Sequence, residues 1–232
     1  MRDMQGIQGR LNEGLWRPLE RPALAWIVAR LPAAVTPDHL TVIGIAGAFV
    51  AFAGYVLSAR DPAFLWLANA GLAVNWFGDS LDGTLARYRR IERRRYGFFI
   101  DHSTDLLSEV LLALGLGLSS YVRFEVACLA LIAYLLMAVL TFVQTVIKGT
   151  LQIAFAGIGP TEVRVGMIIL NLLMLVLPSA PVVVLWAPLS IFDLIVLMTT
   201  AAAFGFFLIA FWREARRLAL DDPAPGGRTG RA

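Results

Sequence analysis

Six long apolar runs alternate with short polar segments along most of the chain. They cover about residues 40–57, 64–87, 98–119, 126–147, 165–185 and 189–211. Each is close to the length of about 20 residues that an α-helix needs to cross a bilayer. Backbone groups in hydrocarbon must be paired within the segment, which favours helices over open strands. The pattern therefore predicts an all-α integral membrane protein with six transmembrane helices.

The N-terminal segment, residues 1–34, has a different pattern. Arginines alternate there with apolar residues at roughly helical spacing, so the segment is too charged to span a membrane. We interpret it as an amphipathic helix in the cytoplasmic headgroup layer, with a solvated helix that packs on the same protein as the alternative. Because the first long apolar run begins only near Leu40, we expect no cleaved signal peptide and a retained opening segment.

This pattern divides the chain into three parts. We expect residues 1–34 to form the juxtamembrane segment, residues 35–218 the six-helix transmembrane domain, and residues 219–232, rich in Pro, Gly and Arg, a disordered cytoplasmic tail. With 58% hydrophobic residues, 16% charged residues and a mean hydropathy of +0.71, the composition is outside the range of soluble globular domains. The single cysteine, Cys128, excludes a disulfide framework and a cysteine-based metal site.

Basic residues are distributed unequally between the two ends of the predicted helices. With the N-terminus inside, the outer loops hold only Arg60 and Arg123, and the inner segments hold the other 18 of the 20 Lys and Arg residues. Cytoplasmic loops of membrane proteins carry such an excess of positive charge. We therefore expect a bacterial inner (plasma) membrane protein in which the loop between the second and third helices faces the cytoplasm.

Four aspartates interrupt the second and third apolar runs: Asp79, Asp82, Asp101 and Asp105. A charged group in hydrocarbon costs about 2.5–3.5 kcal/mol on insertion scales, so such residues are normally functional. On helices, Asp79 and Asp82 share one face, and Asp101 and Asp105 stack one turn apart. Two such faces turned toward each other form a cage of carboxylates, whose repulsion cations relieve. Carboxylate oxygens suit hard divalent ions, so the cage predicts a Mg²⁺ or Mn²⁺ site near the cytoplasmic ends of the helices.

The residues around these aspartates complete a longer motif. It consists, in order, of Asp79, Asp82, Gly83, Ala86, Arg87, Gly97, Asp101 and Asp105, with nine residues between Arg87 and Gly97. The motif resembles the signature of the CDP-alcohol phosphotransferase family, Asp-x-x-Asp-Gly-x-x-Ala-Arg followed after a short gap by Gly-x-x-x-Asp-x-x-x-Asp. Eight positions with fixed residue types and fixed offsets are far more specific than a lone glycine-rich loop.

The resemblance implies roles for these residues. It implies that Asp79, Asp82 and Asp101 bind the metal and that Asp105 is the catalytic base and also a metal ligand. It further implies transfer from a CDP-linked donor to an alcohol, with CMP as the leaving product. For Arg87, a contact with the nucleotide phosphates and a structural ion pair both remain open. The candidate substrate-binding residues are Gly83, Ala86, Arg87, Gly97, Lys148 and Arg164.

The acceptor remains open at this stage. Lys148 and Arg164 either hold an acceptor phosphate, as cations in this area do in relatives that use phosphorylated polyols, or snorkel to anionic headgroups. In contrast, Asp101-His102 and the segment 159–162, Gly-Pro-Thr-Glu, resemble the choline and ethanolamine phosphotransferase branch, which takes a CDP-amino alcohol. Three further polar residues have no assigned role: Asn75, His102 and Glu109.

We therefore expect a metal-dependent enzyme of phospholipid biosynthesis. Its donor would be CDP-diacylglycerol or a CDP-amino alcohol, and its acceptor a lipid or a polar alcohol. Membrane lipids are expected partners and nucleic acid is not; relatives are commonly homodimers, although no residue pattern marks a dimer face. A prenyltransferase would need a second aspartate-rich motif, which the sequence lacks. An ion- or proton-coupled transporter that uses the intramembrane acidic residues is the alternative, without an internal repeat to support it.

Overall fold

The computed structural model describes residues 10–11, 16–148, 151–152, 159–182 and 188–222, and most of these residues are helical. The helices are α1 (Arg17–Val28), α2 (Pro37–Ser58), α3 (Phe64–Arg89), α4 (Arg94–Gly117), α5 (Phe124–Lys148), α6 (Pro160–Val176) and α7 (Ile191–Asp221). Strand β1 (Arg10–Leu11) pairs in parallel with β2 (Leu151–Gln152), and β3 (Pro181–Val182) pairs antiparallel with β4 (Leu189–Ser190). The prediction of an all-α fold is confirmed.

Within the described chain, α2, α5 and α7 are long and apolar enough to cross a membrane. Helices α3, α4 and α6 overlap the other predicted spans. Polar residues of α3 and α4 lower their hydropathy, and α6 has only 17 residues. The six-span count therefore stays a prediction.

The C-terminal ends of two helices, α6 and α7, differ most from the predicted ones. The apolar run suggested a fifth helix to about residue 185, but α6 ends at Val176 and Leu177 is extended, with ψ 142°. Pro178 follows directly, and proline disfavours helical backbone in the residue before it, so this predicted end was wrong. Helix α7 continues past the predicted end near residue 211 to Asp221. Residues 223–232 of the predicted disordered tail lie outside the described residues.

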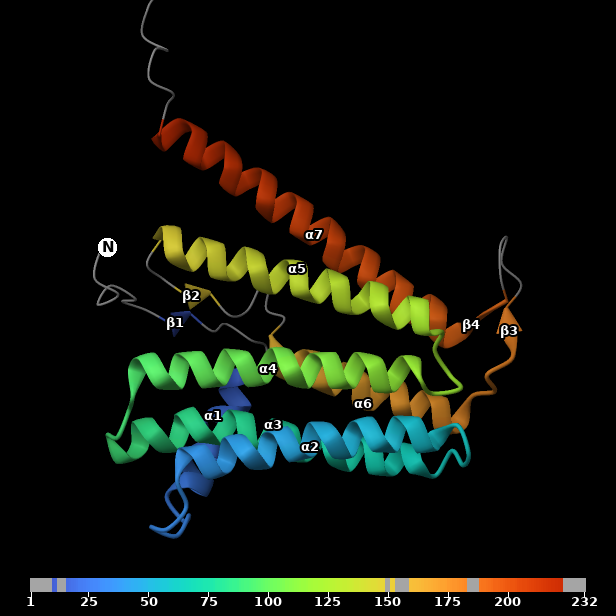
Figure 1. The fold of residues 1–232 in the computed structure, drawn as a ribbon, viewed down its shortest axis with the longest axis horizontal. Coiled ribbons are helices and arrows are strands. Elements are labelled where there is room, and N and C mark those ends of the chain that lie inside the picture. Colours follow the sequence, from blue (N-terminus) through green and yellow to red (C-terminus); the bar gives the residue numbers. More distant parts are fainter. Residues whose placement is uncertain (1–9, 12–15, 149–150, 153–158, 183–187, 223–232) are drawn as a thin grey trace, which may run out of the picture.

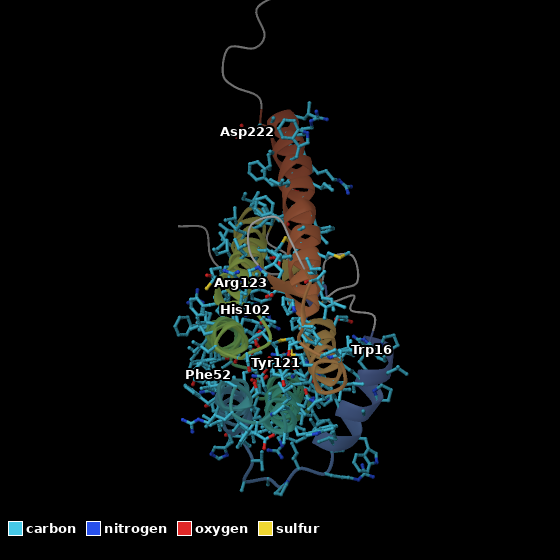
Figure 2. The ribbon with its side chains drawn as sticks, turned by 90° about the vertical axis from the view of Figure 1, so that its right-hand side faces the viewer. Trp16, Phe52, His102, Tyr121, Arg123 and Asp222 are labelled. Atoms are coloured by element: carbon cyan, nitrogen blue, oxygen red, sulfur yellow. The ribbon has the colours of Figure 1, made fainter. Side chains whose placement is uncertain are left out.

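The helices are arranged with α2 and α3 at one edge, α4 and α6 next to them, and α5 and α7 beyond (Figure 1). Helix α7 begins beside α5 and leans away from it toward its C-terminal end. In the side view, Asp222 at that end lies far from Trp16, which precedes α1, and from Phe52 of α2 (Figure 2). Large apolar side chains of α7 are exposed, among them Met198 and Ile209, which suits contact with lipid.

Helices α2 and α3 touch backbone to backbone through glycines. A Cβ atom on Gly47 would lie 2.4 Å from the amide nitrogen of Asn75, and one on Gly71 would lie 2.3 Å from that of Ala51. Small residues at such positions allow membrane helices to pack closely. The contact fixes α3, which carries two of the motif aspartates, against its neighbour.

Helix α1 packs against the rest of the protein. Leu24 and Val28 are buried against apolar residues of α2 and α3. The Glu20 carboxylate accepts hydrogen bonds from Trp76 Nε1 at 2.7 Å and from Thr161 Oγ1 at 2.8 Å. These contacts join α1 to α3 and α6, while its location at a membrane interface stays a prediction.

Basic residues at the end of α3 hold the α1–α2 connection. The guanidinium of Arg89 donates to the backbone carbonyls of Leu31, Pro32, Ala33 and Val35. Helix α3 ends at Arg90, whose left-handed backbone has φ 57°. In the loop that follows, a hydrogen bond to Asp38 raises the pKa of Arg93 above its usual range. The start of α2 thus lies beside the end of α3.

Candidate metal and active site

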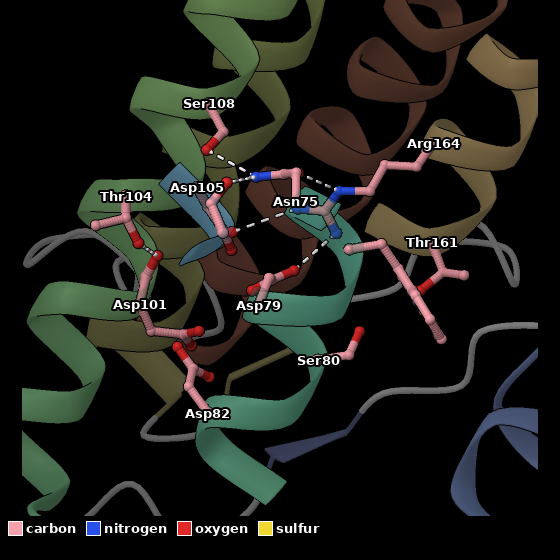
Figure 3. Close-up of polar contacts among 12 residues, drawn as sticks. Asn75, Asp79, Ser80, Asp82, Asp101, Thr104, Asp105, Ser108, Thr161 and Arg164 are labelled. Carbon is pink, nitrogen blue, oxygen red and sulfur yellow. Dashed lines mark hydrogen bonds and ion pairs between the residues drawn. The ribbon is translucent and has the colours of Figure 1, made fainter. Parts of the chain in front are cut away.

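Carboxylate oxygens from α3 and α4 converge at one place in the bundle. One oxygen each of Asp79, Asp101 and Asp105 lies within 4.8 Å of the others (Figure 3). Three carboxylates at this separation repel one another unless cations lie near them. Hard oxygen donors of this kind are the ligands that Mg²⁺ and Mn²⁺ prefer. The donor set therefore fits the predicted divalent metal.

Asp82 lies beside this group but is held differently. Its side chain points toward that of Asp101 in Figure 3, and the residue is only 8% exposed. Oδ2 accepts a hydrogen bond of 2.6 Å from Thr41 Oγ1 of α2, and Oδ1 accepts one from the Gly83 amide. Asp82 is thus oriented by neighbours on α2 and α3, while Asp79, Asp101 and Asp105 form the described group whose oxygens lie within 4.8 Å of one another.

Arg164, near the start of α6, places a positive charge against the carboxylates. Its side chain is 3% exposed. Nη1 lies 2.7 Å from Asp79 Oδ2, and Nη2 lies 3.7 Å from Asp105 Oδ1. The sequence suggested an acceptor phosphate or a lipid headgroup as partner, but the guanidinium is buried away from the surface and is not among the described residues that line the cavity.

Asn75 links this arginine to two other helices. Its Oδ1 accepts a hydrogen bond of 2.8 Å from Arg164 Nε. Its Nδ2 donates to the Gly44 carbonyl of α2 at 3.0 Å and to Ser108 Oγ of α4 at 3.2 Å. The residue is 2% exposed. These contacts make Asn75 a hydrogen-bonded joint between helices α2, α3, α4 and α6.

The remaining candidate substrate residues are divided between the cavity and other places. Gly83 and Arg87 line the cavity. A Cβ atom on Gly83 would lie 3.2 Å from Arg87 Nη1, and Arg87 Nη2 donates to Thr84 Oγ1 at 3.1 Å. Ala86 and Gly97 are not among the described lining residues.

Lys148, at the end of α5, has a carboxylate partner on α7. Its Nζ lies 2.7 Å from Glu214 Oε2, and the Lys148 side chain is 23% exposed. The cavity lining, in the part of the chain that the structure describes, does not include Lys148. The structure therefore does not bring Lys148 and Arg164 together as a pair of cations.

A cavity of about 1260 Å³ begins at the aspartates and continues between the helices. Apolar residues from α4, α5, α6 and α7 line its deeper part, including Leu116, Met137, Met167 and Ile195. Its polar end is lined by Glu20, Arg21, Asp79, Asp82, Asp101 and Asp105. A charged site joined to an apolar space suits a ligand with a charged head and a lipid body.

Two unassigned residues of α4 also line this cavity. His102 Nδ1 lies 2.9 Å from the Phe98 carbonyl, and its ring stacks on Phe98 with centroids 4.3 Å apart. Glu109, one turn deeper than Asp105, is 8% exposed. The wall that α1 contributes was not predicted. Its signal in the sequence is Glu20, an acidic residue between the arginines Arg17 and Arg21.

Comparisons with known proteins agree on one family. The sequence model of CDP-alcohol phosphatidyltransferases matches residues 34–209. An archaetidylinositol phosphate synthase of Pyrococcus horikoshii is 33% identical over 144 residues, which cover 62% of this chain and 71% of that protein. An archaetidylinositol phosphate synthase of Methanothermobacter thermautotrophicus is 31% identical over 52% of this chain and 60% of that protein. Cholinephosphotransferase 1 of Danio rerio is 28% identical over 64% of this chain, which spans 40% of that protein's length.

Proposed function

Because the chain belongs to the CDP-alcohol phosphatidyltransferase family, we propose that it transfers a substituted phosphoryl group from a CDP-linked donor to an alcohol and releases CMP. The match to this family confirms two predictions from the aspartate motif: the family resemblance and the class of enzyme. The observation that carries the proposal is the convergence of Asp79, Asp101 and Asp105 at the polar end of a cavity whose deeper part is apolar. Phospholipid headgroup transfer needs both environments.

A divalent metal, Mg²⁺ or Mn²⁺, is the cofactor that we assign to Asp79, Asp82, Asp101 and Asp105. When bound, such an ion neutralises charge on the pyrophosphate and on the leaving group. The ion-binding carboxylates come from two helices that the glycine contacts of α2 and α3 and the Asn75 hydrogen bonds hold in place. The protein thus holds these carboxylates in place through contacts between helices.

Asp105 is the proposed catalytic base. It accepts the proton of the acceptor hydroxyl as the new oxygen–phosphorus bond forms and the bond between phosphorus and the CMP oxygen breaks. Gly83 and Arg87, on the cavity wall one and two turns beyond Asp79, would face the nucleotide phosphates. The apolar part of the cavity would hold the acyl or isoprenoid chains and exclude water from the reaction.

Two substrate pairs are compatible with this site. The relatives named archaetidylinositol phosphate synthase favour a CDP-linked lipid donor and a phosphorylated polyol, and the cholinephosphotransferase favours a CDP-amino alcohol and a lipid acceptor. In the first case Lys148 and Arg164 are the candidates to hold the acceptor phosphate. Both are paired with carboxylates here, so this role requires them to exchange partners.

The membrane arrangement is part of the proposal. Apolar helices and the family indicate an integral membrane protein. We propose six spans in a bacterial inner membrane, with α1 at the cytoplasmic interface and the aspartates open to the cytoplasm. A homodimer is the proposed assembly.

The test is CMP release by the purified full chain in lipid. A panel of CDP-linked donors and acceptors is assayed with Mg²⁺, with Mn²⁺ and without metal. Metal-dependent release with one pair is expected and identifies both substrates. If folded protein releases no CMP with any pair but carries ions across proteoliposome membranes, the transporter interpretation replaces the enzyme.

A further inference from the structure

The aspartate cluster already contains a cation that belongs to the protein. Arg164 contacts Asp79 at 2.7 Å and Asp105 at 3.7 Å, and Asn75 holds its Nε at 2.8 Å. Its side chain is 3% exposed. Breaking a buried ion pair by removing one partner leaves an uncompensated charge, which is strongly destabilising. Arg164 is therefore tied to the same carboxylates that are assigned to the metal.

The charges around this arginine do not balance. Asp79, Asp101 and Asp105 contribute three carboxylates at the point of closest approach, and Arg164 contributes one positive charge. A divalent ion could therefore balance the remaining net negative charge of the cluster. Such an ion would share Asp79 and Asp105 with the guanidinium, and two positive groups a few ångströms apart in a partly buried site repel each other.

We propose that Arg164 is a built-in counter-cation of the aspartate cluster, which keeps the metal-free site folded and lowers the affinity of the cluster for a divalent metal. The proposal rests on the metal site of the proposed function and goes beyond it. It also explains why this arginine is buried behind the carboxylates instead of lining the cavity. The donor pyrophosphate would restore the negative charge that Arg164 offsets, so that metal and donor bind together.

The experiment compares Mn²⁺ binding to the full chain in lipid nanodiscs, with free Mn²⁺ followed by electron paramagnetic resonance. The variants are Arg164→Gln, which removes the charge, and Arg164→Lys, which keeps it but reaches fewer partners. The matched control is Arg217→Gln, because Arg217 is an exposed arginine that also pairs with carboxylates, Glu214 and Asp221.

Arg164→Gln should bind Mn²⁺ at least about tenfold more tightly than the unaltered protein, since a nearby positive charge is gone. Arg164→Lys should be intermediate, and Arg217→Gln unchanged. In EDTA, the apparent melting temperature of Arg164→Gln should fall below that of the unaltered protein, and saturating Mn²⁺ should restore most of the difference.

Different failures have different meanings. If the unaltered protein binds no Mn²⁺, the metal site of the proposed function is wrong as well. If it binds Mn²⁺ but Arg164→Gln binds as weakly or more weakly, only the role of Arg164 is overturned. Should Arg164→Gln not fold even with Mn²⁺, Arg164→Lys decides: tighter binding supports the proposal, and equal or weaker binding overturns it.

Discussion

Asp79 is the residue at which most contacts of the site meet. One oxygen belongs to the group of three carboxylates, and Oδ2 pairs with the buried Arg164 at 2.7 Å. Through Arg164 and Asn75, the position of Asp79 depends on helices α2, α4 and α6. A change at this residue therefore affects both stability and metal binding.

Asp79→Ala is expected to lose metal-dependent binding of a CDP-linked donor. It should also lower the free energy of unfolding by about 3–5 kcal/mol, because Arg164 loses its closest carboxylate in a buried site. Isothermal titration with Mn²⁺ and a thermal melt in detergent measure the two effects. Asp38→Ala, which removes an exposed partner of Arg93, is the control; unchanged metal affinity in Asp79→Ala would count against the carboxylate cage.

Asp105→Asn is expected to slow CMP release by roughly 10²–10⁴-fold, the usual contribution of a general base. The amide has nearly the same shape as the carboxylate but does not take the proton of the acceptor hydroxyl. Because Asp79, Asp82 and Asp101 remain and the amide oxygen of asparagine can still bind a cation, donor affinity, measured separately by equilibrium binding, should fall far less than the rate of CMP release. Loss of donor binding together with turnover would remove the assignment of Asp105 as base.

At the scale of elements, the close contact of α2 and α3 positions half of the aspartate motif. Cβ atoms on Gly47, Gly54, Gly71 and Gly78 would each lie within 2.4 Å of backbone atoms of the facing helix. Backbone atoms cannot move aside as the end of a flexible side chain can. These glycines therefore set the distance between the two helices.

Gly47→Ala should lower the free energy of unfolding by about 1–3 kcal/mol or more, the usual effect of overpacking a closely packed contact. It should also reduce activity, because α3 would shift relative to α4. Gly205→Ala is the matched control, since a Cβ there meets nothing within 4 Å; alanine in a helix should be neutral or stabilise by about 0.5–1 kcal/mol. Equal melting temperatures for the two variants would contradict the contact argument.

At the scale of the whole molecule, the cavity is lined by helices that are far apart in the sequence. Helices α3 and α4 supply carboxylates, α1 supplies part of the polar wall, and α5, α6 and α7 supply apolar walls. Exposed apolar residues on the outer faces of the helices suit the lipid environment of an integral membrane protein. The cavity thus has the polar end and the apolar body that the proposed active site needs to reach both a polar phase and the bilayer interior.

Metal removal tests this arrangement in the intact protein. EDTA should abolish CMP release, and Mg²⁺ or Mn²⁺ should restore it. At a metal concentration of about 100 times Kd, binding should also stabilise the folded protein by about 2.7 kcal/mol, which a thermal melt detects. Full activity after exhaustive chelation, verified by metal analysis, would show that the carboxylates act without a divalent ion.

The sequence by itself determined the features that depend on local pattern. The apolar runs located α2 to α7 within a few residues at most ends, because a helix that contacts lipid must be apolar along its own length. The aspartate motif identified the family and marked Asp79, Asp101 and Asp105 as candidate metal ligands. It could do so because the spacing of these residues along two consecutive helices is itself a local property.

Only the tertiary structure decided which distant residues meet. Arg164 follows Asp79 by 85 positions, and Thr41 precedes Asp82 by 41, so no periodicity relates them. The same holds for Glu20, which reaches Trp76 and Thr161 and brings α1 to the cavity. Hydrogen bonds and ion pairs are short-range interactions, and which pairs form depends on how the helices pack, not on the pattern along any one of them.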